Sequence, residues 1–98
     1  MLYLACYDIE NDRIRLKIAN HLLALGYERI QKSVFVGMQK PTEKHKLESW
    51  FLTKFGATIA GNILLIPLSQ VAAKEAWHLG KNAPDWEYLS NKIETLIF

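Results

Sequence analysis

The fold begins in the stretch MLYLACYDI, residues 1–9. Every residue in it except Asp8 is apolar or aromatic, which predicts a β-strand. The chain then enters a polar cluster in which Asn11 or Asp12 can cap a helix, because a short side-chain oxygen accepts a free amide of the first turn. The sequence therefore predicts a buried strand that leads directly into a helix.

The elements that follow can be assigned from the spacing of apolar residues. The first helix is expected to stop at Gly26, and its core stripe consists of Ile14, Ile18, Leu22 and Leu25. Residues 28–38 alternate as a single strand would, and residues 41–55 have the pattern of a second helix. Residues 62–68 are a further apolar strand.

This order predicts an α+β protein with the ferredoxin-like βαββαβ sandwich fold, provided that one weak strand lies at residues 57–60 or in the tail. The 98 residues are enough for one core, so we expect a single domain over residues 1–98. Its core would span residues 1–68, and residues 69–98 would form a C-terminal extension used in dimer or partner contacts. An additional C-terminal strand is expected over residues 93–98.

The strands themselves predict a homodimer. A sheet with helices on one face alternates apolar and polar residues, but residues 1–7 and 63–68 do not alternate. The second face of the sheet must be covered, and a chain of this length has few elements left to cover it. Two copies packing sheet against sheet would bury three or four large apolar side chains, which contributes roughly 5–10 kcal/mol.

Composition sets the class of protein. Half of the residues are hydrophobic and 22% are charged, as in a soluble globular protein. The net charge is only +2, although residues 1–54 carry nine Lys/Arg against six Asp/Glu. The single Cys6 excludes an internal disulfide, and no Cys/His cluster has the spacing of zinc ligands. Charged residues interrupt the apolar start too early for a signal peptide, and no apolar run is long enough to span a membrane, so a cytoplasmic protein is expected.

Two stretches resemble a known family. Residues 4–9, LACYDI, are similar to the first strand of the CRISPR-associated protein two family, which ends in a Tyr-Asp-Ile-like motif. Residues 28–37, ERIQKSVFVG, are similar to its Arg-Ile-Gln-x-Ser-Val-Phe-x-Gly strand, and residues 63–68 resemble its third-strand ending. The resemblance covers roughly residues 1–68 and the closing apolar strand.

The resemblance implies a ferredoxin-like homodimer that takes part in the acquisition of new spacers. In that family the dimer bridges two dimers of the integrase subunit and holds a DNA duplex along its basic surface. Several members are described as metal-dependent endonucleases on RNA or DNA. The tail strand of the family commonly extends a sheet within the dimer, which would suit residues 93–98.

Asp8 is the candidate catalytic residue and metal ligand. In the family the matching Asp faces its copy across the dimer axis, and two such carboxylates would hold one Mg²⁺, a cation that prefers oxygen ligands. The ion would polarise a scissile phosphate and lower the pKa of an attacking water. No His lies near Asp8 in the sequence to act as a general base, and Gly61 stands where the family often has an acidic residue. The alternative is that Asp8 is a turn residue beside a helix start.

Four basic residues are candidate contacts for nucleic acid: Arg13, Arg15, Lys17 and Arg29. Such cations neutralise phosphates and bind without sequence preference. In the family, basic residues at the positions of Arg15, Lys17 and Arg29 are linked to activity or nucleic-acid contact, and Lys17 replaces what is often Arg. The alternative is a solvated helix face that pairs with neighbouring acidic residues.

Four further residues are expected to support the site or the dimer interface: Tyr7, Gln31, Ser33 and Phe35. The two aromatic rings could stack on bases, but aromatic residues in strands usually belong to a core or an interface, and we expect Phe35 in the dimer. Gln31 and Ser33 would need hydrogen-bond partners on a covered sheet face.

The resemblance thus implies a nucleic-acid-binding homodimer of CRISPR adaptation, with Mg²⁺-dependent endonuclease activity through Asp8 as a further expectation. Its expected partners are a second copy, duplex DNA or RNA, and the integrase subunit, with no membrane. Three alternatives remain open. They are a non-catalytic scaffold that bridges integrase dimers and holds protospacer DNA, a ribonuclease toxin of related fold, and a small-molecule regulatory ferredoxin-like domain.

Overall fold

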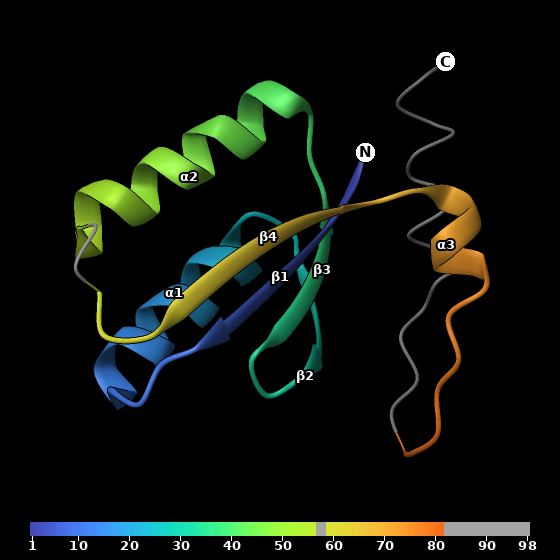
Figure 1. Cartoon of the computed structure of the whole chain (residues 1–98), viewed down its shortest axis with the longest axis horizontal. Coiled ribbons are helices and arrows are strands. Elements are labelled where there is room, and N and C mark those ends of the chain that lie inside the picture. Colours follow the sequence, from blue (N-terminus) through green and yellow to red (C-terminus); the bar gives the residue numbers. More distant parts are fainter. Residues whose placement is uncertain (57–58, 82–98) are drawn as a thin grey trace.

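The computed structural model describes residues 1–56 and 59–81. Its elements, in chain order, are β1 (Leu2–Asp8), α1 (Asp12–Ala24), β2 (Glu28–Gln31), β3 (Val34–Met38), α2 (Pro41–Phe55), β4 (Asn62–Leu68) and α3 (Gln70–Lys74). The strands form one four-stranded antiparallel sheet in the order β2-β3-β1-β4. α1 and α2 lie against one side of this sheet (Figure 1). This arrangement confirms the predicted ferredoxin-like α+β fold.

One predicted element is wrong. The single strand expected over residues 28–38 is a hairpin, in which β2 and β3 are joined by a two-residue turn at Lys32 and Ser33. The apolar residues before and after the turn keep one period of two that only Lys32 interrupts, and this interruption alone indicates a break in the stripe rather than a reversal of the chain. The turn also lacks the Asn-Gly or Asp-Gly pair that marks most such hairpins. β2 supplies the strand that was sought at residues 57–60 or in the tail.

The helices begin where local chemistry satisfies their free amides. The side chain of Asn11 accepts a hydrogen bond from the Ile14 amide at 3.0 Å, which confirms the expected start of α1. α2 begins at Pro41, a residue whose fixed φ suits the first helical position. There the Glu43 carboxylate accepts a hydrogen bond from the Lys40 amide at 2.8 Å.

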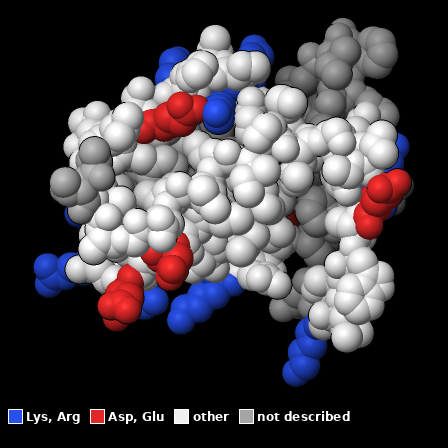
Figure 2. Space-filling view, viewed as in Figure 1, with Lys and Arg blue, Asp and Glu red and all other residues white. Residues whose placement is uncertain are grey.

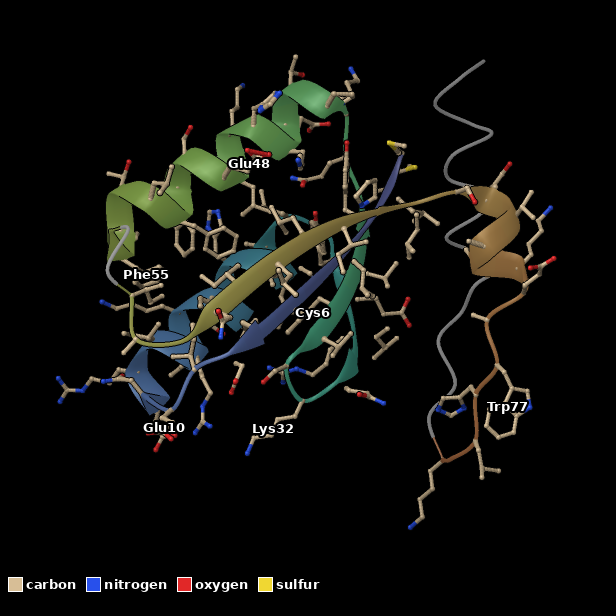
Figure 3. The ribbon with its side chains drawn as sticks, viewed as in Figure 1. Cys6, Glu10, Lys32, Glu48, Phe55 and Trp77 are labelled. Carbon is tan, nitrogen blue, oxygen red and sulfur yellow. The ribbon has the colours of Figure 1, made fainter. Side chains whose placement is uncertain are left out.

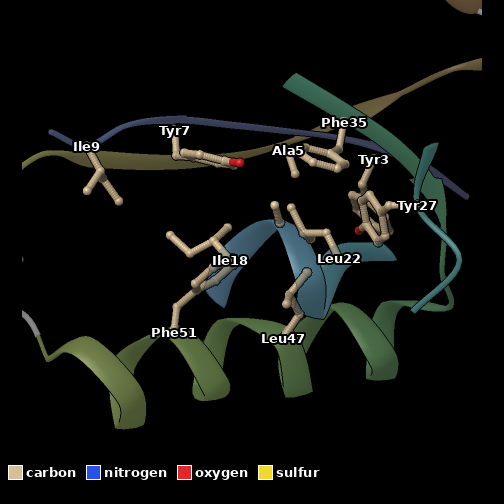
Figure 4. Close-up of a cluster of buried hydrophobic side chains, with 11 residues drawn as sticks. Tyr3, Ala5, Tyr7, Ile9, Ile18, Leu22, Tyr27, Phe35, Leu47 and Phe51 are labelled. Carbon is tan, nitrogen blue, oxygen red and sulfur yellow. The ribbon is translucent and has the colours of Figure 1, made fainter. Parts of the chain in front are cut away.

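The main core lies between the sheet and the two helices (Figure 4). From the sheet come Tyr3, Ala5, Tyr7 and Phe35, and from the helices come Ile18, Leu22, Leu47 and Phe51. Phe35 is fully buried in this core, so its predicted place in a dimer interface is wrong. The reason is its pairing with Ala5 of β1, which places Phe35 on the helix-facing side of the sheet, where its ring stacks against Tyr7.

An aromatic contact holds the two open ends of the hairpin together. The Tyr27 ring lies directly on Gly37, where a Cβ would collide with it. The Tyr27 hydroxyl donates a hydrogen bond of 2.6 Å to the side-chain oxygen of Gln39, the one buried polar residue among those described. Gly37 is therefore required for close packing rather than for a left-handed backbone.

The other face of the sheet is partly covered by the chain itself. Ala73 of α3 packs with Leu2 and Val36 in a second apolar cluster. Leu64 and Ile66 of β4 remain 56% and 40% exposed. The face therefore does need a cover, as the lack of alternation indicated, and α3 supplies part of it; the homodimer stays a prediction. The strand expected over residues 93–98 lies outside the described residues.

Candidate nucleic-acid interface

Asp8 is an exposed side chain on a firmly held backbone. It is the last residue of β1 and pairs with Asn62 of β4, while the preceding Tyr7 amide donates a 3.1 Å hydrogen bond to the Ser33 carbonyl. Gly61 passes so close that a Cβ there would collide with the Asp8 carbonyl oxygen, and its φ of +131° favours glycine. The structure thus fixes the position of Asp8 from both neighbouring strands.

Asp8 alone does not make a metal site. Among the residues that the structure describes, no three His, Cys, Asp or Glu side chains are grouped closely enough to hold a metal ion. Side chains alternate along a strand, so Asp8 lies on the same sheet face as Leu4 and Cys6, away from the helices. Each chain therefore offers one carboxylate as a ligand for Mg²⁺, and a second copy of the chain would have to provide the second carboxylate.

Basic residues converge on the opposite side of the same end of the sheet. A hollow of about 170 Å³ opens between α1 and the β2–β3 turn. It is lined by Tyr7, Asp12, Arg15, Leu16, Ala19, Arg29, Lys32 and Ser33. Four of the predicted site residues are thereby brought together, two of them the basic residues Arg15 and Arg29. We call this site the basic hollow.

Lys32 is the site residue that the sequence analysis missed. It stands in the β2–β3 turn, and Figure 3 shows it projecting from the same end of the sheet as Glu10. In a continuous strand Lys32 would only have broken an apolar stripe. The hairpin places it beside the basic side chains instead. Figure 2 shows further Lys and Arg side chains along this edge of the molecule, with acidic ones among them.

The Arg29 side chain is positioned by the core beneath it. Its guanidinium lies 4.9 Å from the centre of the Phe35 ring. That ring is fully buried and stacks against Tyr7, with the ring centres 6.1 Å apart. A cation above an aromatic face is attracted by the electrons of the ring. The core thus holds one cation of the basic hollow in place.

Arg15 has a different partner. Its guanidinium forms an ion pair with Asp12, three residues earlier on α1. The Asp12 side chain is 85% exposed and that of Arg15 is 31% exposed. The basic hollow therefore contains three cations and one carboxylate, and its charge is positive.

The other predicted residues lie elsewhere. Arg13 and Lys17 are exposed on α1 and do not line the basic hollow. Gln31 is exposed rather than on a covered sheet face, because the irregular pairing between Arg29 and Gln31 and the turn after it carry that position into solvent. Tyr7 is buried, so its ring belongs to the core and is not available to stack on a base.

The histidine on α1 is a packing residue. His21 stacks on Trp50 of α2 with ring centres 3.8 Å apart and planes 2° apart. Burial lowers the pKa of His21 from its ordinary value of 6.5, because the charged form loses water. Burial likewise raises the pKa of the Cys6 thiol, which disfavours the reactive thiolate.

The sheet order and the two helices on one face define a ferredoxin-like α+β protein with a basic hollow at one end of its sheet. The family model described as CRISPR associated protein Cas2 matches residues 1–74. The chain belongs to this family. Within the described residues, no helix is long and apolar enough to cross a membrane.

Individual relatives agree with this assignment. The chain is 32% identical over 89 residues to the CRISPR-associated endoribonuclease Cas2 of Aeropyrum pernix, an alignment that covers 87% of this chain and 92% of that protein. It is 31% identical over 88 residues to a CRISPR-associated endoribonuclease Cas2 of Francisella tularensis subsp. novicida, covering 87% of this chain and 89% of that protein. A relative from Pyrobaculum aerophilum is 51% identical over 41 residues, which span 42% of this chain and 45% of that protein.

Proposed function

We propose that this chain is a nucleic-acid-binding homodimer of CRISPR adaptation that contacts the phosphate backbone through the basic hollow. The observation that carries the proposal is the convergence of Arg15, Arg29 and Lys32 from three different segments on one site. A cation already held over a buried ring loses little conformational freedom when it binds a phosphate. Such binding depends on salt and is indifferent to base sequence.

The uncovered part of the sheet supports self-association. Leu64 and Ile66 are large, apolar and about half exposed, and burying the exposed part of each would contribute about 1 kcal/mol. Asp8 lies on that same face by alternation. A two-fold contact through this face uses the same patch on both subunits, and an axis near the end of β1 would bring two copies of Asp8 toward each other.

The relatives are named endoribonucleases, and their names support an endonuclease that acts on RNA. In such an enzyme Asp8 from each of two copies would hold Mg²⁺, with phosphate oxygens of the substrate as further ligands. When bound, the ion would polarise the scissile phosphate and lower the pKa of a bound water. The contribution of this chain is to hold the carboxylate still, through the Asp8–Asn62 pairing and the close approach of Gly61.

A non-catalytic role is the second candidate. It is favoured by the lone carboxylate at Asp8 and by the absence of any metal-binding group of three within the described part of one chain. In this role the protein would bridge subunits of the CRISPR-associated integrase and hold protospacer DNA. Residues 69–98 would then serve dimer or partner contacts.

One substitution separates the two candidates. Asp8→Asn removes the charge and keeps the size of the side chain. We expect it to leave duplex binding within about twofold of wild type, because Asp8 faces away from the basic hollow, and to abolish Mg²⁺-dependent cleavage of a labelled RNA or DNA oligonucleotide. The matched control is Glu10→Gln, an exposed carboxylate in the next loop. Cleavage that persists in Asp8→Asn would contradict the enzyme proposal, and spacer integration that survives the same substitution would favour the scaffold.

A further inference from the structure

One acidic residue, Asp12, lines the basic hollow among its cations. Asp12 pairs with only one of these three cations, Arg15. Within the described residues, neither Arg29 nor Lys32 forms an ion pair. The basic hollow therefore already contains one carboxylate, and its remaining cations can bind a second anion.

The hollow has the size and lining of a phosphate site. A water molecule takes about 30 Å³ of liquid, so about 170 Å³ holds five or six such volumes, which suits a phosphate group with its oxygens. The Ser33 hydroxyl can donate a hydrogen bond to it. The remaining surface comes from Leu16, Ala19 and the buried Tyr7, and none of these offers an open aromatic face for a base. A backbone phosphodiester is therefore the group that fits.

We propose that the basic hollow seats one phosphodiester group of a nucleic-acid strand and that Asp12 is its built-in competitor. The Asp12 carboxylate holds Arg15 when no strand is bound and releases it to the phosphate on binding. The released carboxylate remains stabilised, because it lies in the first turn of α1, where the helix dipole favours a negative charge, and it is largely exposed to water. Asp12 thus sets the affinity of the site. This inference rests on the proposed binding of nucleic acid.

The test measures the affinity of the full chain for a fluorescein-labelled 20-base-pair DNA duplex, by anisotropy, across a salt series. Asp12→Asn removes the competitor, and Glu10→Gln removes an equal charge from the same segment without touching the hollow. We expect Asp12→Asn to bind about threefold more tightly than Glu10→Gln at the same salt, the effect expected of one exposed ion pair.

A second pair of variants tests phosphate binding in the basic hollow without altering α1. Lys32→Gln should lower the slope of log K against log salt by a part of the roughly 0.9 that one phosphate contact is worth, while Lys54→Gln on α2 leaves the slope unchanged. Inorganic phosphate at millimolar concentration is added as a competitor at constant ionic strength. If inorganic phosphate displaces the duplex no more than chloride does, the result supports a site for the phosphate of a strand. Strong displacement by inorganic phosphate would mean that the site binds free phosphate instead.

The outcomes are distinguishable. If wild type binds the duplex but Asp12→Asn and Glu10→Gln have equal affinities, or Lys32→Gln leaves the slope unchanged, this inference is overturned and the proposed function stands. If wild type shows no salt-dependent binding, the proposed function fails and this inference fails with it.

Discussion

Phe35 tests whether the core, rather than a second subunit, holds the basic hollow together. The side chain is fully buried, so Phe35→Ala should cost about 3–5 kcal/mol through lost burial and the cavity left behind. It also removes the ring beneath Arg29 and the stack against Tyr7, each of which is worth about 1 kcal/mol. The expected loss of about 5–7 kcal/mol is a large share of the total stability of a domain of this size.

The assay is urea unfolding followed by far-ultraviolet circular dichroism at several protein concentrations. Phe55→Ala is the matched control, because Phe55 is only partly buried at the end of α2, and a loss of about 1–2 kcal/mol is expected there. If Phe35 were an interface residue instead, Phe35→Ala would weaken dimerisation and leave the stability of the dilute monomer unchanged. A loss below about 1 kcal/mol at low concentration would refute the placement of this ring in the core.

Three further predictions concern the ends of the sheet and of α1. Gly61→Ala should cost about 1–3 kcal/mol, because its φ is positive and the new Cβ meets the Asp8 carbonyl; a melting temperature within 2 °C of wild type would contradict this. Asn11→Ala should cost about 1 kcal/mol by removing the cap of α1, measured by chemical unfolding, with exposed Asn20→Ala as a control that should not lose stability. Burial lowers the pKa of His21, so the unfolded chain binds its proton more readily, and the free energy of unfolding should be full above pH 6.5 and fall as the pH drops below it. Equal acid sensitivity in His21→Gln would show that another group is responsible.

The fold class could be predicted from residues 1–9 and from the order of the elements, but the number of strands could not. An alternating pattern predicts on which face of the sheet each side chain lies. It does not predict whether the chain reverses at a tight turn. Lys32 and Ser33 carry none of the glycine that usually marks such a reversal. The fourth strand was therefore sought elsewhere.

The same error explains what was found and missed at the site. Arg15 and Arg29 could be named from the sequence, because basic residues near the start of a helix and on a strand are visible as such. Their convergence with Lys32 depends on the hairpin, and the support of Arg29 by the Phe35 ring depends on the core. Contacts of this kind are set by tertiary structure, which no local pattern in the chain encodes.

The most direct test of the central claim compares two triple variants with equal loss of charge. Arg15→Gln, Arg29→Gln and Lys32→Gln together empty the basic hollow of cations, while Lys40→Gln, Lys46→Gln and Lys54→Gln remove three cations at and along α2. For a DNA duplex, we predict that the slope of log K against log salt falls by about 0.9 in the first variant, the value for the one phosphate that the basic hollow seats, and stays unchanged in the second. Equal changes in both variants would mean that net charge, and not the basic hollow, binds the nucleic acid.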